Sequence, residues 1–237
     1  MTTNTSTEAA GRARFEDLQA LMALMTGDEK HDVAATSTLD ALWVLYDRVL
    51  RVTPETAEAQ DRDRFLLSKG HGPMAYYAVL TAKGFLDPAL LPGFGGYDSP
   101  LGYHPDRMLL PGVEISSGSL GHGLPLAVGT ALGLRAQGLT DPAVWVLVGD
   151  AEFDEGSNHE AVAFAGAYGL DRLHTVVIDN SSATHGWQGG IAQRFAAAGW
   201  STATVDGRDH EALYRAFTAE HPGRPHVVIA RVEPKNS

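Results

Sequence analysis

The second half of the chain alternates between short runs rich in Val and Ile and amphipathic helical segments, and this alternation limits the fold more than any other feature. Because the apolar runs are continuous, they are typical of parallel strands that are buried on both faces. Strands that alternate with helices form parallel sheets with helices packed on them. The sequence therefore predicts an α/β fold with a doubly wound, mostly parallel sheet and helices on both faces. The predicted strands span 143–148, 173–178, 200–205 and 226–232, and the helices between them span 157–168, 190–198 and 209–219.

The first half of the chain is less regular. Apolar side chains in residues 15–25 recur every three or four positions, which predicts a helix. A second helix is expected over residues 39–52, with Ser37 or Thr38 as its cap. The remaining expectations are a short strand at 64–68, a helix at 73–82, a long irregular segment at 88–111, and a helix that opens in the Gly-rich run 116–123 and continues to about residue 137.

The composition excludes several classes of protein. The 237 residues include no cysteine, which excludes disulfides, a thiolate nucleophile and a cysteine-ligated metal site. A formal charge of −11 argues against nucleic-acid and membrane partners, because phosphate surfaces attract clustered Lys and Arg. The longest apolar stretch, 120–134, is interrupted by Gly, Pro and His, and no secretory signal opens the chain. We therefore expect a cytoplasmic protein with one domain, residues 12–237, behind a disordered tail, residues 1–11.

Polar side chains follow two neighbouring strands of the predicted sheet. Asp150 comes directly after one strand, and Asn180 follows the next strand along the chain. Because the carboxyl ends of parallel strands share one edge of a sheet, we expect these side chains to be neighbours. Carboxylate and amide oxygens suit Mg²⁺ or Ca²⁺, and the helix that begins near Ser157 would favour a diphosphate at its positive end. The pair predicts a metal–diphosphate site, although either residue alone would suggest only a cap or a turn.

Other motifs fail on spacing. The acidic run 150–154 resembles the start of an EF-hand, but its glycine comes one place late and its twelfth position is Ala161. His159-Glu160 begins a zinc-protease motif whose second histidine is replaced by Ala163. Neither a dinucleotide-binding fingerprint nor a P-loop occurs in the sequence.

Several runs, taken together, resemble the thiamine diphosphate-binding region of transketolases. The resemblance extends from about Leu39 to Val232 and covers the amino-terminal third of a full transketolase. It implies the thiamine diphosphate-binding fold, and specifically its diphosphate-binding domain. The runs that carry it are Leu67-Ser-Lys-Gly-His-Gly72, Gly102-Tyr-His-Pro105, Val113-Glu-Ile-Ser-Ser-Gly-Ser-Leu-Gly-His-Gly123, Gly149-Asp150-Ala151, Glu155-Gly-Ser-Asn-His-Glu160 and Asp179-Asn180.

The resemblance implies a metal and diphosphate site at the ends of two strands. Asp150 and Asn180 would be side-chain ligands of Mg²⁺, and the backbone carbonyl of Ser182 would be the third protein ligand. Gly149 and Ala151 would lie against the diphosphate. The family has a glycine where this chain has Ala151, which is small enough that we still expect binding.

The resemblance also implies three active-site histidines. His71 would lie beside the diphosphate, and His104 would contact the hydroxyls of the ketol donor. A gapless alignment places His31 at the position of a further active-site histidine, although the family's surrounding Gly-His-Pro-Gly is absent here. Another catalytic histidine of the family, beyond the last strand, has no counterpart in this chain.

Three further positions complete the expected site. Gly118 and Leu120 match positions that touch the aminopyrimidine and thiazolium rings of the cofactor. Glu155 matches an acid that takes part in cofactor activation and in a subunit interface, with Glu160 as its neighbour in that network.

The resemblance implies the amino-terminal subunit of a split transketolase that is active as an α2β2 heteromer. A second polypeptide would carry the pyrimidine-binding and carboxy-terminal domains. The reaction would use Mg²⁺ and thiamine diphosphate to transfer a two-carbon ketol unit from a ketose or ketose phosphate to an aldehyde, in central metabolism or in a specialised biosynthetic pathway. Two alternatives stay open: an α-type subunit of a 2-oxo acid dehydrogenase or pyruvate-using acyl transferase, and a non-catalytic domain that binds cofactor or partner.

Overall fold

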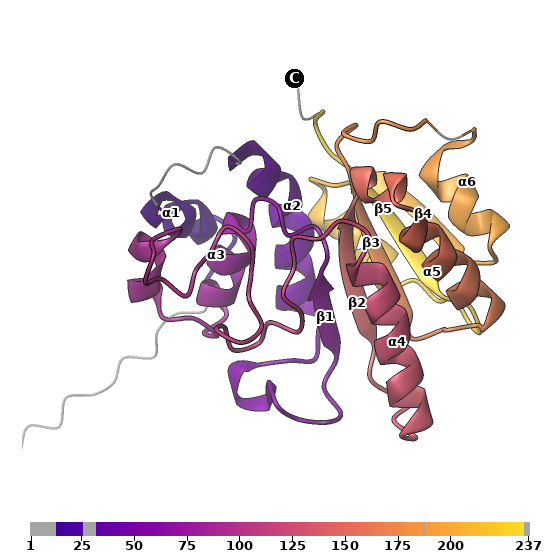
Figure 1. The fold of residues 1–237 in the computed structure, drawn as a ribbon, viewed down its shortest axis with the longest axis horizontal. Helices are drawn as coiled ribbons and strands as arrows, with labels where there is room; N and C mark the ends of the chain where they lie inside the picture. Colours follow the sequence, from indigo (N-terminus) through magenta and orange to yellow (C-terminus); the bar gives the residue numbers. More distant parts are fainter. Residues whose placement is uncertain (1–12, 26–31, 187, 235–237) are drawn as a thin grey trace, which may run out of the picture.

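The computed structural model describes residues 13–25, 32–186 and 188–234, and it is drawn in Figure 1. The predicted tail and His31 lie outside the described residues. None of the helices in the described ranges has the length and hydropathy of a membrane span. The strands are β1 (Arg64–Leu67), β2 (Val144–Gly149), β3 (Leu173–Asp179), β4 (Ser201–Asp206) and β5 (His226–Arg231), and the α-helices are α1 (Asp17–Leu24), α2 (Asp32–Val44), α3 (Met74–Ala82), α4 (Gly123–Ala136), α5 (Gly156–Ala167), α6 (Gly190–Ala197) and α7 (His210–Phe217).

The five strands form one sheet in the order β1-β2-β3-β5-β4, and every neighbouring pair is parallel. Every residue of β2 is buried, as expected for a continuous apolar run in the middle of a parallel sheet. The edge strand β4 has only half-buried and exposed residues. The predicted parallel α/β sheet is therefore confirmed.

Helices cover the sheet on both faces, and alternate residues of β2 point to opposite layers. Trp145 and Leu147 pack in a cluster with α2, α3 and α7, whereas Val144, Val146 and Val148 pack in a second cluster with α4, α5 and α6. In Figure 1, α4 and α5 run along one side of the strands. The doubly wound arrangement predicted from the sequence is confirmed.

The predicted start of the second helix is wrong. Helix α2 begins at Asp32 rather than near Leu39, so Ser37 and Thr38 lie inside it and are buried. Ser and Thr are strongly preferred as caps, but a cap contributes only about 1 kcal/mol, and packing of the helix on the core overrides it. The α-helix ends at Val44 and continues as one wider π-type turn, residues 45–49, before the chain becomes extended.

Three histidines pack together at the amino-terminal end of the sheet. His174 stacks on Trp145 with ring centroids 4.1 Å apart, and it meets the edge of His221 at 4.8 Å. His221 stacks on His226 at 4.9 Å, and the carbonyl of Ala216 accepts a hydrogen bond from Nε2 of His226. Burial lowers the pKa of His174 well below its ordinary value and also lowers the pKa of His226. Both rings are therefore neutral in the folded protein near pH 7.

We expect this cluster to make the fold sensitive to acid. In the unfolded chain, His174 and His226 have ordinary pKa values near 6.5. Below that pH the unfolded state therefore binds more protons than the folded state, in which both pKa values are lowered. Their contribution to stability is complete above pH 6.5 and is lost as the pH falls, by up to about 1.4 kcal/mol per pH unit for each group. Denaturant unfolding between about pH 7.5 and pH 5.5 should show this loss. The variant His174→Phe, which keeps a ring on Trp145, should lose less stability over that range, and an equal loss in both proteins would contradict the assignment.

Candidate functional site

A cavity of about 310 Å³ lies at the carboxyl edge of the sheet, where parallel sheets bind their ligands. Its walls come from the loops that follow β1, β2 and β3 and from the irregular segment before α4. At the ends of β2 and β3 it is lined by Gly149, Ala151, Asn180 and Ser182. The four residues that the sequence placed at neighbouring strand ends thus meet in one cavity.

Asp150 is buried directly beside this cavity and ties the ends of β2 and β3 together. It is 1% exposed, and its carboxylate accepts hydrogen bonds from the backbone N–H of Ser182 (2.7 Å), the hydroxyl of Ser182 (2.5 Å) and the N–H of Ala183 (3.1 Å). Its partners lie on the loop after β3, not on the helix that follows it. The simpler interpretation of Asp150 as a helix cap is therefore wrong.

Asn180 lines the cavity with an unsatisfied oxygen. Its side chain is 4% exposed, and Oδ1 has no hydrogen-bond partner among the described residues. A buried polar atom without a partner costs about 1–3 kcal/mol, so its presence points to a ligand. Between Asn180 and Ser182, Ser181 has a φ of 57°, a left-handed conformation that is rare for a residue other than glycine and is often found at ligand sites.

The oxygen atoms of these residues fit a hard cation. A carboxylate, an amide oxygen and a backbone carbonyl suit Mg²⁺, and so few protein ligands leave room for water and phosphate oxygens. Within the described residues, no group of three or more His, Asp or Glu side chains has the geometry to hold a metal by itself.

Two histidines also line the cavity. The ring centroids of His71 and His104 are 6.3 Å apart, and both residues line the cavity with Gly118 and Leu120. Gly118 has a φ of +125°, and a Cβ on it would lie 3.0 Å from the ring of His104. Only glycine therefore lets the Gly-rich turn approach this histidine. Leu120 is 50% exposed and lies at the rim.

Glu152 is the main residue of this region that sequence reasoning missed. It is 1% exposed and accepts hydrogen bonds from Ser68 Oγ (2.5 Å), Gly121 N (3.1 Å) and Gly149 N (3.1 Å). Burial raises the pKa of the Glu152 carboxyl above its ordinary value, and these three donors and the charge of Lys69 offset only part of that rise. Nothing near Glu152 in the sequence reveals this role, because Ser68 is 84 residues away.

The loop after β1 contributes a second residue that sequence reasoning missed. Lys69 lines the cavity, and its ammonium group donates a hydrogen bond to the carbonyl of His71 (3.3 Å). Its aliphatic stem lies against Gly149, where an added Cβ would be 3.4 Å from it. The Lys69 ammonium thus brings positive charge to a cavity expected to receive a diphosphate.

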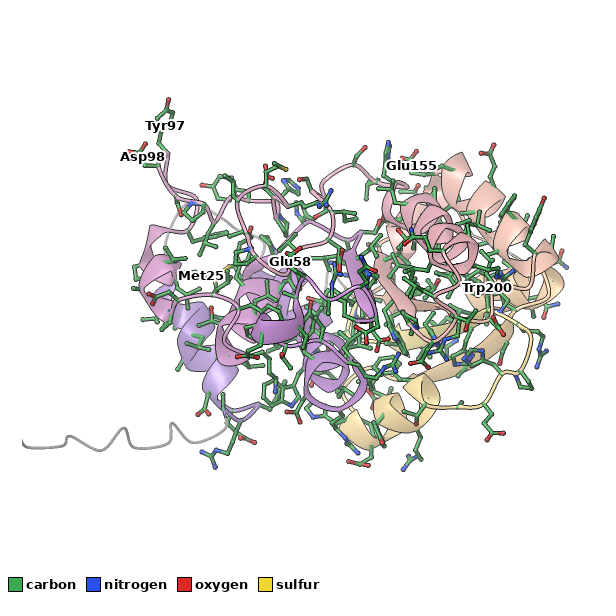
Figure 2. All side chains as sticks on the ribbon, turned by 90° about the horizontal axis from the view of Figure 1, so that it is seen from below. Met25, Glu58, Tyr97, Asp98, Glu155 and Trp200 are labelled. Carbon is green, nitrogen blue, oxygen red and sulfur yellow. The ribbon has the colours of Figure 1, made fainter. Side chains whose placement is uncertain are left out.

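Glu155 does not line the cavity. It is exposed at the start of α5, and Figure 2 shows it at the surface of the molecule. Glu160 is exposed one turn further along the same helix. If Glu155 and Glu160 have the expected roles at a subunit interface, they act from this exposed surface and not from the walls of the cavity. His31 lies outside the described residues.

The sequence and the fold both match known proteins. The family described as transketolase, thiamine diphosphate binding domain, matches residues 16–232. An apulose-4-phosphate transketolase subunit from Actinobacillus succinogenes is 36% identical over 207 residues, which cover 84% of this chain and 75% of that protein. A Rhodococcoides fascians protein named ferredoxin fas2 is 56% identical over 218 residues, covering 92% of this chain and 72% of that protein. This chain has no cysteine to ligate an iron–sulfur cluster.

Full-length transketolases are about three times as long as the part they share with this chain. The transketolase of Rhodobacter capsulatus is 32% identical over 224 residues, which cover 33% of its length. The solved transketolase from Leishmania mexicana superposes with a TM-score of 0.76 at 27% identity, covering 92% of this chain and 36% of that one. The chain belongs to the transketolase family and corresponds to its thiamine diphosphate-binding, amino-terminal part.

Proposed function

We propose that this chain is the cofactor-binding subunit of a two-component transketolase. The observation that carries the proposal is the cavity at the sheet edge, which is lined by His71, by His104 and by Asn180, whose Oδ1 has no hydrogen-bond partner among the described residues. Relatives of comparable length support it, since the names of the apulose-4-phosphate transketolase protein and of the 6-deoxy-6-sulfo-D-fructose transketolase protein SqwG both describe subunits.

In this proposal, Mg²⁺ is held by the side chains of Asp150 and Asn180 and by the carbonyl of Ser182. The diphosphate lies near Gly149 and Ala151, where small residues leave room for it. Thiamine diphosphate, when bound, supplies the electron-accepting ring that allows a bond beside a ketose carbonyl to break.

The two histidines of the cavity wall orient the substrate. Imidazole nitrogens take part in hydrogen bonds, so His104 is proposed to bind sugar hydroxyls and His71 to bind the diphosphate end of the site. His31 is proposed as a third histidine, and Gly118 and Leu120 as contacts to the cofactor rings. Exposed Glu155 is proposed to act at an interface between subunits.

The partner is proposed to be a polypeptide with the pyrimidine-binding and carboxy-terminal domains, in a cytoplasmic α2β2 complex. The named substrates of two relatives are an apulose phosphate and a sulfonated fructose, which supports an anionic ketose as the donor. The reaction is then transfer of a two-carbon ketol unit to an aldehyde, and a specialised biosynthetic pathway is the proposed setting.

The test is reconstitution. The purified chain is assayed alone and mixed with a candidate partner, a polypeptide that carries a transketolase pyrimidine-binding domain, in the presence of Mg²⁺, thiamine diphosphate, a ketose phosphate and an aldehyde. Ketol transfer in the mixture but in neither protein alone is the expected result. Turnover of 2-oxo acids instead of ketoses would replace the proposal with an acyl-transferring enzyme. Cofactor binding without turnover of either class would reduce it to a binding role.

A further inference from the structure

Three loops of the cavity converge on the carboxylate of Glu152. Ser68 belongs to the loop after β1, Gly121 to the turn before α4, and Gly149 to the end of β2, and all three donate hydrogen bonds to Glu152. The network extends further, since the N–H of Gly123 donates to Ser68 Oγ at 3.1 Å. One buried side chain thus joins loops that lie far apart in the sequence.

The chemistry of this junction requires a group that only accepts hydrogen bonds. Oε2 of Glu152 faces the Ser68 hydroxyl and the Gly121 amide, and Oε1 faces the Gly149 amide. An amide side chain of the same shape would turn its NH₂ group toward at least one of these donors. A donor that faces another donor in a buried site loses its hydrogen bond and remains desolvated.

The Gly-rich turn is closely packed at Gly121. A Cβ on Gly121 would lie 2.6 Å from Ser157 Oγ and 2.7 Å from the Cβ of Glu155. The backbone of the Gly-rich turn is therefore packed against α5 on one side and bound to Glu152 on the other. Because Gly118 and Leu120 belong to the same turn, the position of Glu152 fixes where this turn meets the cavity.

We propose that Glu152 is a positioning residue, which sets the spacing of the three loops and thereby the affinity of the cavity for Mg²⁺ and thiamine diphosphate. Its two carboxylate oxygens accept hydrogen bonds from Ser68, Gly121 and Gly149, and both Glu152 and Ser68 also belong to the lining of the cavity. The inference rests on the proposed function, because it takes that cofactor as the ligand of the cavity. The closing experiment separates the two.

Glu152→Gln is the informative variant, and Glu220→Gln is its matched control. Glu220 is exposed near the end of α7, so the control makes the same chemical change away from the cavity. Titration calorimetry of the full chain with thiamine diphosphate at saturating Mg²⁺ should show affinity about 10–100-fold weaker in Glu152→Gln, the range for groups that orient ligands without touching the metal. The control should bind as the unaltered chain does.

Amide NMR spectra of the free chain give a readout that needs no cofactor. In Glu152→Gln the signals of Gly121 and Gly149, and of Gly123 through Ser68, should shift, while those of helices α6 and α7 should stay in place. A role in overall folding would instead lower the melting temperature and disturb the whole spectrum.

Ser68→Ala keeps the inference open to refutation if Glu152→Gln does not fold. It removes one donor from the same carboxylate, so it should weaken cofactor affinity in the same direction by a smaller factor. Unchanged cofactor affinity in Ser68→Ala, and in Glu152→Gln where that variant folds, would overturn the positioning role and leave the proposed function intact. An unaltered chain that binds no thiamine diphosphate, alone or with its partner, would overturn the proposed function, while the amide shifts would still report whether Glu152 couples the loops.

Discussion

Asp150→Asn is expected to lower the affinity for Mg²⁺ and thiamine diphosphate by at least about 100-fold, more than the loss of a group that only orients metal ligands. The substitution keeps the shape of the side chain and removes its charge, which a divalent cation needs in a site with so few protein ligands. In the native protein the carboxylate accepts hydrogen bonds from Ser182 and Ala183. The amide of asparagine would turn its own NH₂ group toward at least one of these donors. The measurement is titration calorimetry with thiamine diphosphate at fixed, saturating Mg²⁺.

Asp154→Asn is the matched control for this prediction. Asp150 and Asp154 are the first and last residues of a short 3-10 helix. The carboxylate of Asp154 accepts hydrogen bonds from Thr184 N (2.8 Å), Thr184 Oγ1 (2.6 Å) and His185 N (3.1 Å). It therefore holds the same loop as Asp150, but, unlike Asp150, it is not flanked in the chain by residues that line the cavity. Near-native cofactor affinity in Asp154→Asn is expected. Equal losses in the two variants would show that loop anchoring, and not metal binding, explains the effect.

Asn180→Ala gives an independent check of the same site. Since Oδ1 of Asn180 has no partner among the described residues, its removal should leave the melting temperature unchanged or raise it while cofactor affinity falls. A variant that loses stability and keeps its affinity would contradict the assignment of this oxygen as a metal ligand.

Gly123→Ala is expected to destabilise the protein by about 3 kcal/mol, at the upper end for an overpacked site. A Cβ on Gly123 would lie 2.2 Å from the Cβ and 2.8 Å from the Cα of Ser68, so the backbone of one loop must move. The movement also breaks the hydrogen bond from Gly123 N to Ser68 Oγ and leaves the carboxylate of Glu152 with a displaced partner. Denaturant unfolding measures the stability, and cofactor affinity should fall as well.

Gly129→Ala, in the same helix, should have the opposite effect. A Cβ on Gly129 meets no atom within 4 Å, and alanine stabilises a helix interior by about 0.5–1 kcal/mol relative to glycine. A pair of variants with equal stability would show that the contact between Gly123 and Ser68 is looser than the structure indicates. If Gly123→Ala lowers the free energy of unfolding and Gly129→Ala raises it, the destabilisation comes from the contact with Ser68 beside the cavity and not from replacing glycine in the helix.

Much of the fold followed from local patterns. The Val-rich runs around Val146 and Val177 predicted buried parallel strands because such runs are apolar on both faces. The start of α2 could not be predicted in this way, since Ser37 and Thr38 favour caps in isolation but are buried within the helix. Packing on the core decided that boundary.

Of the candidate site, the sequence by itself determined the edge at which it lies and many of the residues that meet there. Loops after parallel strands share one edge, and this geometry alone brings Asn180 and Gly149 to one cavity. Only the tertiary structure showed that the carboxylate of Asp150 holds the loop after β3 and that Glu152 joins three loops. The physical reason is that a hydrogen bond depends on the position and direction of both partners, and residues as distant as Ser68 and Glu152 acquire these only when the whole chain has folded.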